Sequence, residues 1–334
     1  MRLILLLLVG CGGNGGDSSK TPDDSGGTTV DGPWHLLANE VPSGMMLSAH
    51  EGATGTIIVG GDLHGGPGTI SHLSEDRLCV ETEEQDQALW WIHGRSATDW
   101  YAVGVQGIVI HESDGVRTRE DIDTTDTLFG VYDDGTDVWA VGGDVGSTLH
   151  GSIWRKPAGG DWEVVASELP GLMFKPWAGW FVGHGQAYFW DGTALVEHHP
   201  PNGARLVTAR GTADDLWAVG GLANPEMYHW TGAEWETVTV DAACATDSLN
   251  GVYVDPDGNP WVAGHAGSAA KWDGSTWECA DKAIASEDFH AVWWVDGEPI
   301  WLGGNLLAAA EEDNYGTLGH FGEHREIEVV EGCD

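Results

Sequence analysis

Short runs of Trp, Val, Ile and Ala recur along the chain, and each stands between a cluster of turn-forming residues and one or two glycines. The clearest copy is the segment 212–221, which reads TADDLWAVGG. A buried strand between two tight turns has this pattern. Seven copies occur, at 55–61, 97–104, 135–143, 178–185, 212–221, 258–267 and 297–304. Each copy predicts one buried β-strand.

The glycines that close these runs recur at a regular spacing. They are Gly60, Gly104, Gly142, Gly183, Gly220, Gly264 and Gly303, and successive members lie 44, 38, 41, 37, 44 and 39 residues apart. A strand of the form Leu-x-x-apolar-x precedes each run, as in LSAHE (47–51), LWWIH (89–93) and LMFKP (172–176), and two further strand-like segments follow. A period of about forty residues with four strands is typical of a β-propeller blade. The sequence therefore predicts an all-β, seven-bladed β-propeller of four-stranded antiparallel blades over residues 33–334.

The first strand of this domain has a separate role in the prediction. Residues 33–38 (PWHLLA) follow a turn in the same way as the outermost strand of a later repeat. We expect this segment to help close the ring, the alternative being that it lies outside a complete last blade.

The N-terminus predicts export and a lipid anchor. The apolar run 3–9 is too short to span a bilayer and reads as a signal peptide over residues 1–10. Its end, Leu8-Val9-Gly10-Cys11, resembles the lipobox of bacterial lipoproteins. The resemblance implies that Cys11 is lipidated and becomes the N-terminus, with two or more acyl chains such as palmitate as the anchor. The alternatives are an uncleaved signal anchor and a misassigned start.

Residues 11–32 are rich in Gly, Ser, Asp and Thr and cannot bury enough apolar surface to fold, so they predict a flexible tether. Anchor and tether together place the protein in a bacterial cell envelope, on the outer membrane, facing the periplasm or the cell surface.

The charge of the chain restricts its partners. It has 53 acidic against 14 basic residues, a net charge of −39. Nucleic acids and anionic lipid surfaces need Lys and Arg to neutralise phosphate, so neither is expected as a partner. We interpret the charge mainly as a means of solubility, with attraction of cations or basic partners as the alternative.

The repeats resemble those of bacterial lipoprotein propellers built from D-[VL]-W-A-V-G units, and more distantly those of Asp-box and WD-type propellers. The resemblance covers about residues 33–334 and implies the fold. The turn 272–277 (WDGSTW) lacks the Ser-x-Asp opening of an Asp-box, and no F/Y-R-I-P segment occurs, so a sialidase is not indicated.

Chemistry-bearing clusters give no catalytic or metal site. His72, His111, His229 and His320 occupy one position of the third strand in different blades. Equivalent positions lie on a wide circle and cannot converge on one metal, so we interpret these histidines as packing residues with a hydrogen-bonding nitrogen. No serine lies on a strand-to-helix elbow, and carboxylates are too numerous for any pair to indicate a glycosidase. We expect no metal and no cofactor.

A ligand, if there is one, is expected at the mouth of the central channel, on the face made by the second-to-third strand turns. Those turns contribute Asp62, Gln106, Asp144, His184, His265 and Asn305, and the ends of the inner strands contribute His93, Tyr132, Arg210, Tyr253 and Trp293. Arg210 stands out because basic residues are rare. Such a rim suits a small polar ligand or a peptide loop, and equally a channel plugged by its own side chains.

These observations predict a non-catalytic binding or scaffolding module for an unknown protein or glycan. The alternative is a carbohydrate-active propeller, either a lectin or a glycoside hydrolase. A third possibility is a purely structural role, which would need no pocket.

Four cysteines remain after Cys11, and export to an oxidising compartment favours their pairing. Cys244 and Cys279 belong to the fourth-strand regions of neighbouring blades, and Cys79 and Cys333 are placed in the same way in blades 1 and 7. We therefore predict the disulfides Cys244–Cys279 and Cys79–Cys333. The alternatives are Cys79–Cys244 with Cys279–Cys333, and Cys79–Cys279 with Cys244–Cys333.

Overall fold

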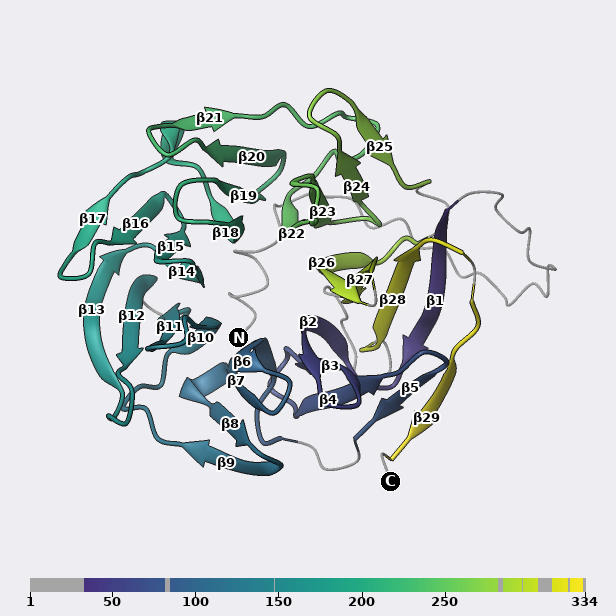
Figure 1. Ribbon diagram of the computed structural model, residues 1–334, viewed down its shortest axis with the longest axis horizontal. Coiled ribbons are helices and arrows are strands. Elements are labelled where there is room, and N and C mark those ends of the chain that lie inside the picture. Colours follow the sequence, from purple (N-terminus) through teal and green to yellow (C-terminus); the bar gives the residue numbers. More distant parts are fainter. Residues whose placement is uncertain are drawn as a thin grey trace.

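The computed structural model describes residues 33–81, 85–146, 148–281, 285–295, 297–305, 314–323 and 325–332. Seven β-sheets stand around a central axis, and each contains four antiparallel strands (Figure 1). The predicted seven-bladed β-propeller with four-stranded blades is thereby confirmed. Across the described ranges no helix has the length and apolar character needed to cross a membrane. The signal peptide and tether predicted over 1–32, with Cys11, lie outside the described residues.

The blades follow one another along the chain, and blades 1 to 6 each run from inner to outer strand. Blades 1 to 3 contain β2 (Met45–Gly52), β3 (Gly55–Gly61), β4 (Gly68–Leu73), β5 (Arg77–Val80), β6 (Leu89–Ser96), β7 (Asp99–Gly104), β8 (Val109–Ser113), β9 (Val116–Glu120), β10 (Thr127–Asp133), β11 (Val138–Gly143), β12 (His150–Lys156) and β13 (Glu163–Pro170). Blades 4 to 6 contain β14 (Met173–Trp177), β15 (Trp180–Gly183), β16 (Gln186–Trp190), β17 (Leu195–Glu197), β18 (Leu206–Gly211), β19 (Leu216–Gly221), β20 (Pro225–Trp230), β21 (Trp235–Thr237), β22 (Leu249–Val254), β23 (Pro260–Gly264), β24 (Ala269–Trp272) and β25 (Trp277–Cys279). Blade 7 contains β26 (Asp288–Val295), β27 (Glu298–Gly304), β28 (Gly316–Phe321) and β1 (Trp34–Val41).

The ring is closed by the first strand of the domain. β1 pairs antiparallel with β28, with Trp34 opposite Phe321, and forms the outer strand of blade 7. Trp34 also packs against Trp301 of β27, with 4.8 Å between ring centroids. The prediction that residues 33–38 help to close the ring is confirmed.

The last strand differs from its prediction. The segment just before Cys333 was assigned to the fourth-strand region of blade 7, and this is wrong: β29 (Glu328–Glu331) lies beside β5 in blade 1 (Figure 1). The pairing is parallel, with Val330 opposite Cys79. The physical reason is that β1 already occupies the outer edge of β28, so the end of the chain pairs with the free edge of β5 instead.

A steric requirement explains why glycine closes every repeat. A Cβ atom at Gly220 would lie 1.7 Å from the backbone oxygen of Arg205, the residue just before β18. The same crowding occurs in the other six blades, where the oxygens of Met45, Ala88, Thr127, Leu172, Ser248 and Asp288 would lie 1.9, 2.0, 2.1, 2.2, 2.7 and 1.9 Å from such an atom. The second strand therefore passes the start of the inner strand at a distance that only glycine permits.

The disulfide Cys244–Cys279 is present and confirms that prediction. It connects the segment after β21 of blade 5 to β25 of blade 6, with 4.8 Å between the two Cα atoms. Cys333 lies outside the described residues, so the pairing of Cys79 with Cys333 stays a prediction. The parallel pairing of β29 with β5 brings Val330 opposite Cys79, three positions before Cys333 in the sequence.

Candidate functional site

One position of the repeat places a side chain at the end of the inner strand in every blade. It lies five residues after the residue whose backbone oxygen faces the closing glycine. The seven side chains are His50, His93, Tyr132, Trp177, Arg210, Tyr253 and Trp293, and we call them the inner-strand belt. Six of the seven are rings, and Arg210 is the exception.

Neighbouring members of the belt contact one another from blade to blade. His93 and Tyr132 have ring centroids 4.6 Å apart, and Tyr132 and Trp177 have centroids 4.8 Å apart. The guanidinium carbon of Arg210 lies 3.9 Å from the ring centroid of Trp177 and 5.1 Å from that of Trp293. The belt is therefore a largely continuous aromatic lining that holds one cation.

A cavity of about 790 Å³ opens over the belt. All belt members except Tyr132 line it, together with residues at the adjoining ends of first and second strands and one turn residue, Thr212: Glu51, Gly52, Gly55, Thr56, Gly211, Thr212, Val254, Trp294 and Val295. Its volume falls within the range of small-molecule and peptide side-chain pockets. Among the described residues that line it, Glu51 is the single acidic one.

Arg210 carries its charge without a charged partner. The residue is 2% exposed, and of its nitrogens only Nη1 donates a hydrogen bond, to the backbone oxygen of Ala209 at 3.2 Å. Nε and Nη2 are buried and unpartnered. In the part of the chain that the structure describes, no carboxylate oxygen lies within 4.0 Å of the guanidinium. Burial lowers the pKa of Arg210 to about 9, so the group remains protonated at neutral pH.

A second buried cation, Lys175, lies close to Arg210. Its Nζ donates a hydrogen bond to the backbone oxygen of Phe129 at 3.3 Å and lies 2.9 Å from the ring centroid of Trp91. The guanidinium of Arg210 lies 5.0 Å from the same ring. Burial, and then the charge of Arg210, lower the pKa of Lys175 well below its usual value. The centre of the propeller thus contains two buried basic side chains, although the chain as a whole is strongly acidic.

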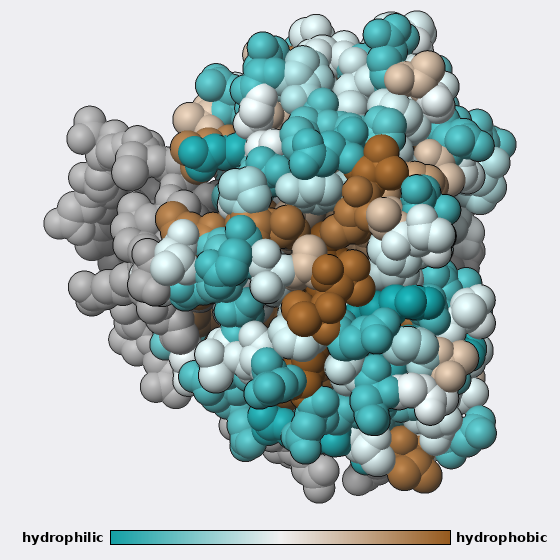
Figure 2. Space-filling view, turned by 90° about the vertical axis from the view of Figure 1, so that its left-hand side faces the viewer, coloured by the Kyte–Doolittle hydropathy of each residue, from teal (hydrophilic) through white to brown (hydrophobic). Residues whose placement is uncertain are grey.

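The outside of the ring is different in character. Figure 2 shows the side on which β13 and β17 lie in Figure 1, and this side is mainly hydrophilic with one narrow hydrophobic band. Two exposed valines are on those outer strands, Val164 on β13 and Val196 on β17. The belt cavity, in contrast, is lined by aromatic rings together with Arg210, which has no charged partner among the described residues.

Not all the predicted rim residues share this face. The belt contains five of the predicted residues: His93, Tyr132, Arg210, Tyr253 and Trp293. His184 and His265 come directly after second strands, so the prediction that they share a rim with Arg210 is wrong. In an antiparallel hairpin, the end of the second strand lies beside the start of the inner strand, and hence at the opposite face. The same applies to Asp62, Gln106, Asp144 and Asn305.

The opposite face has its own, smaller cavity of about 290 Å³, which His184 lines together with Arg205. Burial, and then the nearby Arg205, lower the pKa of His184 to about 4. His265 lies elsewhere on that face, 3.0 Å from a carboxylate oxygen of Asp288. These two histidines therefore do not form one site with each other or with the belt.

Two belt members, His50 and Trp177, were missed from the sequence. If the inner strands of blades 1 and 4 are taken to begin at Leu47 and Leu172, the belt position falls on Glu51 and Pro176. The contacts of the closing glycines show that the equivalent first residues are instead Met46 and Met173, so the belt position falls on His50 and Trp177. The spacing back from the closing glycine was a signal that could have found His50, which is ten residues before Gly60, as Arg210 is before Gly220. It could not have found Trp177, which is only six residues before Gly183.

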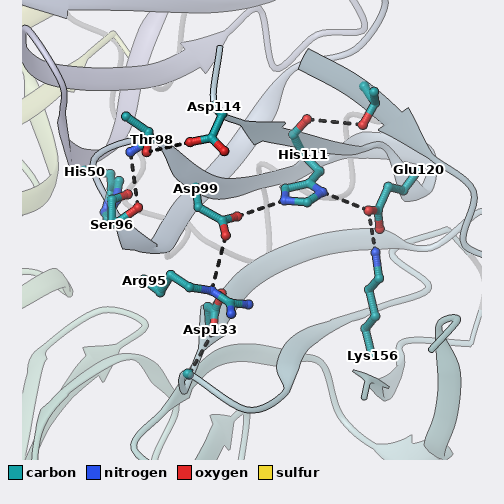
Figure 3. A network of polar contacts seen from close by, with 12 residues as sticks. His50, Arg95, Ser96, Thr98, Asp99, His111, Asp114, Glu120, Asp133 and Lys156 are labelled. Carbon is teal, nitrogen blue, oxygen red and sulfur yellow. Dashed lines mark hydrogen bonds and ion pairs between the residues drawn. The ribbon is translucent and has the colours of Figure 1, made fainter. Parts of the chain in front are cut away.

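The third-strand histidines pack and form hydrogen bonds, as predicted. His229 stacks on Trp217 with 4.0 Å between ring centroids, and its Nε2 contacts a carboxylate oxygen of Asp215 at 2.6 Å. His111 lies between Asp99 and Glu120, and the latter also contacts Lys156 of the next blade (Figure 3). Within the described ranges, no group of three or more His, Cys, Asp or Glu is arranged to hold a metal ion.

No protein-family model and no curated protein sequence matches this chain. Solved structures of similar fold include YCF48 bound to D1 peptide, with 15% identity and a TM-score of 0.63 over 87% of this chain and 97% of that one. Virginiamycin B lyase from Staphylococcus aureus is similar with 14% identity and a TM-score of 0.64, over 87% and 100% of the two chains. The WD40 propeller domain of Doa1 has 9% identity and a TM-score of 0.61, over 86% and 96%. At these identities the similarity shows the fold alone.

Proposed function

We propose that this protein is an exported, lipid-anchored and non-catalytic binding module, and that the inner-strand belt receives a segment of a partner protein. The observation that carries the proposal is the cavity of about 790 Å³ over the belt. Aromatic side chains supply a large contact area at a low cost in conformational entropy, and for this reason they are frequent in protein-binding surfaces. A cavity lined by aromatic rings and one unpaired cation is suited to a few side chains of a peptide.

The comparisons support a peptide as the kind of ligand. YCF48, a propeller of the same fold, has been solved with D1 peptide bound. This chain resembles YCF48 in fold only. The support is therefore limited to showing that a propeller of this fold can offer a site of the size of a peptide.

A second candidate function is binding of a glycan. Trp293 and Trp294 both line the cavity, and tryptophan faces also stack on sugar rings. Hydrolysis of a glycan would need a pair of carboxyl groups at the bond that is cut, and Glu51 is the single acidic residue among the described residues of the lining. A lectin is therefore favoured over a hydrolase, and a glycan array on the purified protein would separate it from a peptide binder.

Site-specific photo-cross-linking in the native cells tests the proposal. A benzophenone amino acid would replace Thr212, at the rim of the belt cavity, and in a matched control Leu149, which lines the cavity of the opposite face. We expect a cross-linked protein partner from position 212 and not from position 149. Equal cross-linking from both positions, or none from position 212, would contradict a partner at the belt.

The anchor has its own test. Substitution of Cys11 by Ser removes the thiol that the lipid would modify, so we expect the protein in the soluble fraction or as an uncleaved precursor. Unchanged partitioning into membranes would contradict lipidation at Cys11.

A further inference from the structure

The two unpartnered nitrogens of Arg210, Nε and Nη2, belong to the same edge of the guanidinium group. Their N–H groups run parallel and match the two oxygens of a carboxylate, which such an edge binds through two charge-assisted hydrogen bonds. The third nitrogen, Nη1, is already bonded to the backbone oxygen of Ala209. The donors that remain therefore include Nε–H and the Nη2–H beside it, the pair suited to bidentate binding of an anion.

Arg210 lines the belt cavity, but its Nε and Nη2 atoms are buried, so a ligand in the cavity reaches them only after a neighbouring side chain moves. The guanidinium packs against the rings of Trp177, Trp91 and Trp293 at 3.9, 5.0 and 5.1 Å from their centroids, which limits its movement. Aromatic faces attract a cation, but they accept no conventional hydrogen bond from its N–H groups in the plane. A buried charge without a counter-ion is unfavourable, so an anion that enters the cavity relieves a cost already present in the free protein.

The rim of the same face carries the opposite charge. Exposed carboxylates lie on several turns between first and second strands: Asp134, Asp214, Asp215 and Asp257. Glu51 at the cavity itself is exposed as well. A ligand with many negative charges, such as a nucleic acid or a polyuronide, would be repelled by this rim. A ligand with one carboxylate and positive charges close to it in the sequence fits both the rim and the centre.

From this arrangement we infer that the belt cavity selects a peptide carboxylate that has basic residues close to it in the sequence, with Arg210 binding the carboxylate through Nε and Nη2. The inference rests on the proposed function, because it names the chemistry of the segment that the belt receives. Both sources of a peptide carboxylate, the chain terminus and an Asp or Glu side chain, offer the same two oxygens. The aromatic members of the belt contact the neighbouring side chains of the peptide.

Affinity selection from peptide pools tests the inference. The probes are three pools of N-acetylated hexapeptides that each contain two lysines: one with a free C-terminal carboxylate, one amidated with an internal Glu, and one amidated without an acidic residue. Full-length protein in detergent would be the bait, and mass spectrometry would count the retained peptides. The variants are Arg210→Met, Trp293→Ala, and Arg205→Met as the matched control, which removes the same charge from the opposite face of the same blade.

We expect at least one acidic pool to be enriched at least about tenfold over the neutral pool, which corresponds to about 1.4 kcal/mol. Arg210→Met should abolish this preference and Arg205→Met should retain it. The pool that is enriched identifies the terminus or the side chain as the source.

The same experiment separates a wrong carboxylate inference from a wrong peptide-binding proposal. Equal retention of all three pools, lost in Trp293→Ala, would overturn the carboxylate inference while the belt remained a peptide site. Retention of none, or preferential retention of a glucuronate-containing disaccharide added as a competitor, would overturn both the inference and the proposed peptide function.

Discussion

The guanidinium carbon of Arg210 lies 3.9 Å from the ring centroid of Trp177, and the two side chains come from adjacent blades. A desolvated contact of this kind is worth about 2 kcal/mol. Removing a charged group from water costs several kcal/mol. The contact with Trp177 alone therefore does not offset the burial of the cation, and two N–H-bearing atoms of the guanidinium, Nε and Nη2, still lack a hydrogen-bond acceptor among the residues that the structure describes.

Replacement of Arg210 should make the protein more stable. Arg210→Met removes a buried charge that has no counter-ion and keeps a side chain of similar length against Trp177. We expect the free energy of unfolding to rise by about 1–4 kcal/mol in urea at pH 7. The control is Arg155→Met, which removes an arginine held by Asp137 at 2.7 Å and should lower stability. A loss of stability in Arg210→Met would show that the charge is structural.

Acid should weaken the fold through His290. Burial, and then the charge of Lys175, lower the pKa of His290 to about 3, whereas the unfolded chain takes up this proton near pH 6.5. Because the unfolded state binds the proton first, stability should fall as the pH drops below 6.5, by about 2 kcal/mol at pH 4.5 from this group alone. His290→Asn keeps a donor for the backbone oxygen of Leu47, which His290 Nδ1 contacts at 2.7 Å. Urea unfolding over this pH range should show a shallower decline in the variant, and parallel curves would contradict the assignment.

The fold could be predicted from the sequence because its repeat is a local steric requirement. Each closing glycine faces a backbone oxygen that leaves no room for Cβ, so the spacing of the blades is visible in the residue types. The position of β29 could not be predicted in this way. It depends on which sheet edge remains free after β1 has paired with β28, and that competition involves both ends of the chain.

The candidate site could be predicted in part. Arg210 was identified because a cation on an inner strand is rare in this chain, and Tyr132, Tyr253, Trp293 and His93 because they end inner strands. His50 and Trp177 were missed because their strands are shifted by one residue relative to the leucine pattern. The lack of a partner for Arg210 is a property of the assembled ring, since it depends on side chains from several blades.

Alanine at a closing glycine should destabilise the ring. In Gly220→Ala the new Cβ would meet the oxygen of Arg205 at 1.7 Å, and the backbone must move to make room. We expect a loss of about 1–3 kcal/mol in the free energy of unfolding. Gly160→Ala is the control, because its nearest atoms would lie 3.4 Å away or more and its effect should stay within about 0.5 kcal/mol. Equal stabilities of the two variants would contradict the steric explanation of the repeat.

Loss of the disulfide between blades 5 and 6 should also lower stability. Cys244 and Cys279 are 35 residues apart, and a cross-link of that span contributes about 4 kcal/mol in the chain-entropy treatment. The double substitution of both cysteines by serine should therefore unfold at lower urea concentration than the oxidised wild type. An unchanged midpoint would show that the two blades are held together without the bond.

Arg210 is inferred to bind a peptide carboxylate through its unpartnered Nε and Nη2 atoms. The most direct measurement is the ¹⁵N–¹H signal of the Arg210 Nε–H group, assigned by its absence in Arg210→Met, during titration with a retained acidic hexapeptide and then with its neutral amide counterpart. We predict that the proton signal moves to lower field with the acidic peptide and not with the neutral one, as expected when Nε–H begins to donate to a carboxylate. A signal that stays in place while the acidic peptide binds, or that moves equally with both peptides, would contradict the claim.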